Sequence, residues 1–127
     1  MANTRVRDLP PFVSRRLAQL RENDKPVLIY STFPSVAEAE RVGGTLVDQG
    51  LAACVNILPG MVAIYVWEGK RQREGEAAML IKTRAALAGE AMDEVRRLHP
   101  YGNPALLILP VEGGSQDFLK WIAEQTG

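Results

Sequence analysis

Residues 68–76 read EGKRQREGE, a polar stretch that joins two segments rich in β-branched and aromatic residues. The first segment, residues 52–68, is interrupted by Pro59-Gly60, which predicts a bulge or bend within one long strand. The second, residues 75–84, predicts the returning strand of a hairpin. A doubly wound parallel sheet would need a helix between these strands, and the polar stretch reads as a hairpin connection. This hairpin constrains the fold more than any other feature of the chain.

A strand and a helix precede the hairpin. The apolar run Val27–Tyr30 lies between prolines and predicts a strand. A helix follows it, with an N-cap at Ser35 and a C-terminal glycine at Gly50. Gly43 and Gly44 inside this helix cost about 1 kcal/mol each relative to alanine. Such glycines predict close packing against a neighbouring backbone rather than a ligand.

A helix, a strand and a last helix follow the hairpin. An apolar stripe from Leu87 to Leu98 predicts a helix that Pro100 ends. PALLILPV, residues 104–111, predicts a fourth strand, and Ser115 begins a last helix. The order strand, helix, strand, strand, helix, strand, helix is the split βαβ pattern of ferredoxin-like domains, so we predict an α+β fold with a C-terminal helix.

The length of 127 residues fits one domain, which we place at residues 25–127. Residues 1–24 carry only a weak helical stripe and are interpreted as an N-terminal extension. Fifteen basic and fifteen acidic side chains cancel, which argues against nucleic acid as a partner. No apolar run approaches the ~18 residues of a membrane helix. One cysteine and no secretory signal pattern predict a cytoplasmic protein.

The predicted hairpin strands, residues 52–68 and 75–84, are longer than the usual five or so residues. Their tips extend beyond what two helices can cover, which leaves apolar side chains and unpaired edges in water. Another copy of the same chain is the economical partner for such edges. We therefore predict a ring-like homo-oligomer whose hairpins reach across to neighbouring subunits.

The hairpin also carries an aromatic cluster. Tyr65 and Trp67 alternate with Val66 and should lie on one face of the strand, with Lys82 of the returning strand near them. One interpretation is a pocket for a small anion or metabolite. The other, which is the commoner arrangement, is interface packing with the amine turned outward.

A second cluster surrounds the single histidine. His99 ends the second helix, and with Tyr101 and Cys54 it offers neutral donors to a soft divalent or monovalent metal ion. Two or three donors without a carboxylate predict a weak metal site. The carboxylates Glu68, Glu74 and Glu76 flank the hairpin and are interpreted as exposed charges on a polar connection rather than as an acid–base pair.

No catalytic signature accompanies these clusters. Neither common glycine-rich phosphate loop occurs in the sequence, and any serine or cysteine nucleophile would depend on the single histidine as its base. We therefore predict a binding protein rather than an enzyme.

Five motifs carry a family resemblance: LAACVNILPG, IYVWEGK, LIKTR, LHPY with a following proline, and DFLKW. In their order and spacing they resemble the CutA family, proteins linked to divalent cation tolerance, over about residues 26–125. The resemblance implies a ferredoxin-like homotrimer with long hairpins at the subunit contacts. It also implies similarity to the trimeric PII signalling proteins, which bind small effectors in clefts between subunits.

The resemblance further implies a response to metal ions, because some CutA members bind copper. This chain has Ser31 where some members have a cysteine, Leu98 where some have a second histidine, and Gly102 where an acid or amide is usual. His99 and Cys54 are then the soft donors that persist.

The expected function is therefore divalent cation tolerance, with weak binding of copper or another divalent metal ion at clefts between subunits. The alternative is a PII-like module that binds a small metabolite or a protein partner. The predicted ligand cleft comprises Tyr65, Trp67, Lys82, His99 and Tyr101.

Overall fold

The computed structural model describes residues 24–127. Its elements in chain order are β1 (Pro26–Phe33), α2 (Val36–Asp48), β2 (Cys54–Trp67), β3 (Lys70–Arg84), α3 (Ala85–Leu98), β4 (Leu107–Pro110) and α4 (Gln116–Gln125). The predicted N-terminal extension lies, except for Asp24, outside the described residues. No helix within residues 24–127 is long and apolar enough to cross a bilayer.

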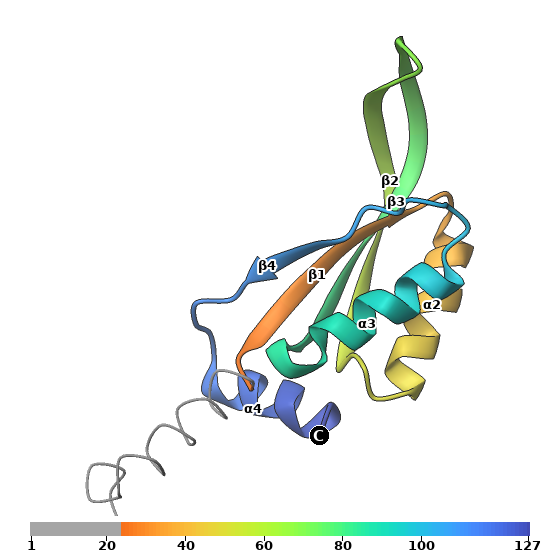
Figure 1. The fold of residues 1–127 in the computed structure, drawn as a ribbon. Helices are drawn as coiled ribbons and strands as arrows, with labels where there is room; N and C mark the ends of the chain where they lie inside the picture. Colours follow the sequence, from red (N-terminus) through yellow and green to blue (C-terminus); the bar gives the residue numbers. More distant parts are fainter. Residues whose placement is uncertain (1–23) are drawn as a thin grey trace, which may run out of the picture.

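The strands form one sheet in the order β2-β3-β1-β4, and every neighbouring pair is antiparallel. This order, with helices after β1 and β3, confirms the predicted ferredoxin-like α+β fold. Figure 1 shows α2 and α3 together on one side of the sheet, with α4 near the end opposite the hairpin tip. The core lies between the sheet and these two helices, where Ile29, Phe33, Leu46, Met79 and Val95 are fully buried.

The hairpin is longer, and its turn tighter, than the sequence predicts. The polar stretch at residues 68–76 is not a loop, because β3 already begins at Lys70. Glu68 and Gly69 have φ angles of 50° and 76°, and positive φ at both central residues permits a two-residue type I′ turn. The bulge predicted at Pro59-Gly60 is confirmed by a register shift between Leu58 and Met61. In Figure 1 the hairpin projects well beyond the rest of the sheet.

Two serines begin helices as predicted. The Ser35 hydroxyl accepts a hydrogen bond from the Glu38 amide at 3.2 Å, and the Ser115 hydroxyl accepts one from the Phe118 amide at 3.4 Å. β4 is shorter than the predicted strand, residues 104–111. Leu106 packs against the core instead of extending the pairing with β1.

The two glycines inside α2 have different surroundings. A Cβ atom on Gly43 would lie 2.8 Å from Val55 Cγ2 and 2.9 Å from Met79 Sδ, whereas one on Gly44 would meet nothing within 4 Å. Close packing is therefore confirmed for Gly43, although the neighbours are side chains of β2 and β3 rather than backbone. Gly44 has no such packing reason.

We expect alanine to have opposite effects at these neighbouring positions. Gly44→Ala should raise the free energy of unfolding by about 0.5–1 kcal/mol through helix propensity. Gly43→Ala should lower it, because overpacking against the β-branched Val55 costs about 1–3 kcal/mol. Urea denaturation of both variants measures the difference, and equal shifts would contradict the packing described.

Candidate functional site

A cavity of about 790 Å³ opens between one face of the hairpin, from Glu76 near its base to Trp67 beside the turn, and the loop that follows α3. The hairpin and the loop thus form its two walls, with a contribution from β1. The residues that line it are Thr32, Tyr65, Trp67, Gln72, Glu74, Glu76, Pro100, Tyr101, Gly102, Asn103 and Ala105. We refer to it as the hairpin cavity.

Strand register brings the hairpin residues to one face. Tyr65 pairs with Gln72 across the two strands, and side chains at every second position share that face. Trp67 and Glu74 therefore lie beside this pair. Ile64 and its neighbours at alternate positions lie on the opposite face of the ribbon. The short turn fixes this register, so it also determines which side chains reach the cavity.

His99 supports the loop wall. It is the C-cap of α3, its side chain is only 8% exposed, and its ring stacks on Phe33 with 4.4 Å between centroids. Nε2 lies 2.7 Å from the Thr32 carbonyl oxygen, and Nδ1 accepts the Tyr101 amide at 3.0 Å. Because a carbonyl can only accept, the proton is assigned to Nε2. Both ring nitrogens are thus used within the chain, and a metal ion at either one would displace a hydrogen bond.

Two carboxylates and two phenols face each other in the cavity. The Tyr101 hydroxyl donates a long hydrogen bond of 3.4 Å to Glu76 Oε2. Burial raises the pKa of Tyr101, and the negative charges of Glu76 and Glu74 raise it further. The pKa of Tyr65 is also raised, first by loss of hydration and then by the nearby Glu74 carboxylate. Both phenols therefore remain protonated donors at neutral pH.

The structure brings together some of the residues predicted for the ligand cleft. Tyr65, Trp67 and Tyr101 line the hairpin cavity, and His99 lies behind Tyr101 with 4.9 Å between ring centroids. Lys82 lies elsewhere: its ammonium is 5.2 Å from the Phe118 ring centroid, in a smaller cavity beside α4. Lys82 is six positions from Glu76 in β3, a separation of about 20 Å along the strand.

The predicted donors His99 and Cys54 are also apart. Cys54 is level with Leu28 across β3, whereas His99 bonds to Thr32, four residues or about 13 Å along β1. Because nitrogen and sulfur ligands lie about 2.0–2.3 Å from zinc, one ion of this size cannot touch both residues within one chain. Among residues 24–127, no group of three or more His, Cys, Asp or Glu could hold a metal ion.

Sequence reasoning missed the acidic part of the site. Glu74 and Glu76 line the hairpin cavity, although the sequence suggested exposed charges on a loop. Placing the turn at Glu68-Gly69 would have put them in a strand, at alternate positions on the aromatic face. Thr32, Gln72 and Asn103 carry no sequence signal that distinguishes them from other polar residues.

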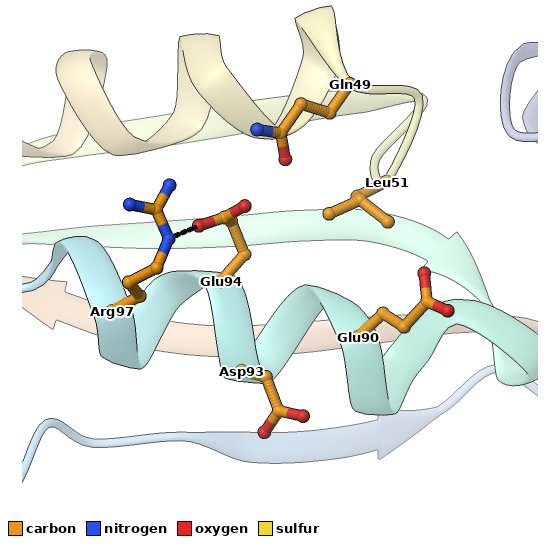
Figure 2. Close-up of a pocket in the computed structure, with 6 residues that line it drawn as sticks. All are labelled: Gln49, Leu51, Glu90, Asp93, Glu94 and Arg97. Carbon is orange, nitrogen blue, oxygen red and sulfur yellow. Dashed lines mark hydrogen bonds and ion pairs between the residues drawn. The ribbon is translucent and has the colours of Figure 1, made fainter.

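A second cavity, of about 450 Å³, lies between the end of α2 and α3 and is also acidic (Figure 2). Arg97 hydrogen-bonds to Glu94 and holds the pKa of that carboxyl below its ordinary value. Figure 2 shows Asp93 pointing away from Glu94. The acids therefore do not converge, and the cavity lining contains no aromatic residue.

The packing of His99 predicts a structural cost for its removal. We expect His99→Ala to lower the free energy of unfolding by about 2–4 kcal/mol, because it leaves a gap beside Phe33 and an unsatisfied Thr32 carbonyl. Arg96→Ala, in the last turn of the same helix, removes only an exposed ion pair with Asp93 and should change stability by less than about 0.5 kcal/mol. Equal losses in thermal or urea unfolding would contradict this role of His99.

Comparison with known proteins agrees with this fold. Residues 27–125 match the family described as CutA1 divalent ion tolerance protein. The divalent-cation tolerance protein CutA of Archaeoglobus fulgidus is 45% identical over 76% of this chain and 93% of its own length. Protein CutA 1, chloroplastic, of rice (Oryza sativa subsp. japonica) is 35% identical over 95% of this chain and 68% of its own length. The crystal structure of CutA from Xylella fastidiosa has a TM-score of 0.80 at 38% identity and covers 81% of this chain and 99% of that one. This chain therefore belongs to the CutA1 divalent ion tolerance family.

Proposed function

We propose that this protein contributes to tolerance of divalent cations by binding cationic ligands in the hairpin cavity. One observation carries the proposal: Glu74 and Glu76 are the charged residues among those that line the cavity, so its wall is negative. Family membership supports the link to divalent cations. The role is binding rather than catalysis. The cytoplasm stays our prediction for its location, although the name of the rice relative places that protein in the chloroplast.

The chemistry of the donors bears on which cations bind. Copper or another soft metal ion would prefer His99 and Cys54, but both ring nitrogens of His99 are hydrogen-bonded and Cys54 is distant. The donors that remain for a cation are the carboxylate oxygens of Glu74, which is exposed, and of Glu76, which accepts the Tyr101 hydroxyl. Carboxylate oxygens suit hard divalent cations that keep part of their water shell, so we propose weak binding through these oxygens.

We also propose that the chain works as a homotrimer. The projecting hairpin and β4 expose large apolar side chains, which is costly for an isolated chain. The most exposed aliphatic side chains are Val66 at 69%, Leu107 at 59%, Ile64 at 58%, Leu58 at 48%, and Val62 and Ile108 at 47%. β4 is also an edge strand with only β1 as its partner. Contacts between identical chains would cover both features.

Light scattering tests the assembly. The native protein should have about three times the 14.0 kDa mass of one chain. Ile64→Asp, on the exposed hairpin, should give monomers, because a carboxylate would be buried without a partner at the subunit contact. Ala86→Asp, on the exposed first turn of α3, provides a matched control that should remain trimeric. A monomeric native protein at micromolar concentration would overturn the trimer.

Growth under metal stress tests the function. Cells without a CutA protein of their own should survive inhibitory manganese, a hard divalent cation, better when they express this chain. The double variant Glu74→Gln/Glu76→Gln should lose this protection, because it removes the negative charge of the cavity. Calorimetric titration with Mn²⁺ should show affinity at least about tenfold weaker for that variant.

The matched control is Glu90→Gln/Asp93→Asn, which removes two carboxylates from the second cavity. This variant should protect cells as well as the native chain does. Equal protection by the Glu74→Gln/Glu76→Gln variant would exclude the hairpin cavity as the cation site.

A further inference from the structure

The charge of the hairpin cavity has a single sign. Among the described residues that line it, Glu74 and Glu76 are charged and no lysine or arginine is present. Arg71 and Arg73 lie on the other face of β3, because strand side chains alternate. Lys70 pairs with Trp67 at the hairpin tip and shares this face, but it is not among the residues that line the cavity and is four positions, or about 13 Å, from Glu74. A negatively charged occupant would therefore be repelled and a cation attracted.

Three aromatic rings share the cavity with these carboxylates, those of Tyr65, Trp67 and Tyr101. Trp67 is 64% exposed and Tyr65 is 39% exposed, so much of their apolar surface contacts water. A hydrated metal ion is coordinated by oxygen atoms and would leave this surface wet. A cation that carries C–H groups can instead lie on the ring faces, which attract it through their quadrupoles.

The two carboxylates are separate anionic points rather than one chelating pair. Glu74 and Glu76 are two residues apart in β3, which places their backbones about 7 Å apart. Each lies near a different phenol: Glu76 accepts a hydrogen bond from Tyr101, and Glu74 is close enough to Tyr65 to raise the pKa of that phenol. A four-carbon chain with an ammonium group at each end spans about 6 Å between its nitrogens. Such a molecule can place one charge near each carboxylate.

From these observations we infer that the hairpin cavity binds organic ammonium ions, and that short linear diamines fit it best. The carboxylates attract the two charges, and the rings cover the aliphatic chain. The inference rests on the proposed function, because it assigns a ligand class to the same cavity. It goes further by giving the rings of Tyr65 and Tyr101 a role that a metal ion alone would not need.

Calorimetric titration of the full-length protein with 1,4-diaminobutane tests this inference. We expect saturable binding of one diamine per chain that weakens as salt is added. The uncharged 1,4-butanediol, of nearly the same length, and the dianion succinate should give no saturable heat. Binding of the diol as tight as that of the diamine would overturn the inference, because the charge would then be irrelevant.

Variants separate the charge from the rings. Glu74→Gln/Glu76→Gln and Tyr65→Leu should each weaken diamine binding about tenfold, since Tyr65 pairs with Gln72 next to Glu74 on the same face. Trp121→Leu, which removes an aromatic ring on α4, should leave diamine affinity unchanged. Circular dichroism and light scattering would confirm that each variant is folded and assembled as the native protein is. Unchanged affinity in Tyr65→Leu would remove the rings from the site and overturn the inference.

Metal measurements keep this result distinct from the proposed function. Tyr65→Leu should retain native affinity for Mn²⁺ and should still protect cells from it, since the proposed metal contacts are the carboxylate oxygens. Protection by the native chain without diamine binding would overturn the inference alone. Diamine binding without protection would overturn the proposed tolerance function and leave the ligand class intact.

Discussion

The pairing of β2 with β3 is the interaction on which the site depends. The two-residue turn at Glu68-Gly69 sets the register at the tip, and the irregularity between Leu58 and Met61 resets it near the base. A shift of one residue would turn Tyr65 to the opposite face of the ribbon and bring Ile64 to the cavity face in its place. The chemical character of the hairpin cavity is therefore determined by the backbone pairing of its two strands.

The sequence contained enough information to predict the fold but not all of its dimensions. Order of elements, N-caps at Ser35 and Ser115, and a bulge at Pro59-Gly60 could all be inferred, because each depends on local chemistry. The turn could not. Residues 68–76, EGKRQREGE, are polar enough for a loop, but residues 70–76 belong to β3. This part of the strand lies in the hairpin that projects beyond the rest of the sheet, where no face is covered by a helix. The polar side chains correctly indicated that most of this segment is exposed to water, but exposed residues were wrongly expected to form a loop.

The same limit explains the errors in the site. Alternation correctly placed Tyr65 and Trp67 on one face, but it does not show how far along a long strand a neighbour lies. Lys82 was therefore expected beside them, although it belongs to the cavity near α4. For His99 the residue type suggested a ligand, whereas the loop uses both of its nitrogens for hydrogen bonds to Thr32 and Tyr101. Only coordinates distinguish a histidine that binds a metal from one that fixes a loop.

Assembly and ligand binding should be linked in this architecture. An isolated two-stranded ribbon is marginally stable in water, and here its tip lies beyond the cover of the helices. The proposed trimer would bury its apolar face, and the opposite face, with Trp67 and Glu74, would then be held in place for a ligand. A ligand that binds only this ordered ribbon must stabilise the assembly by mass action. By the same linkage, a substitution that loosens the subunit contacts should weaken ligand affinity even when it lies on the far face of the hairpin.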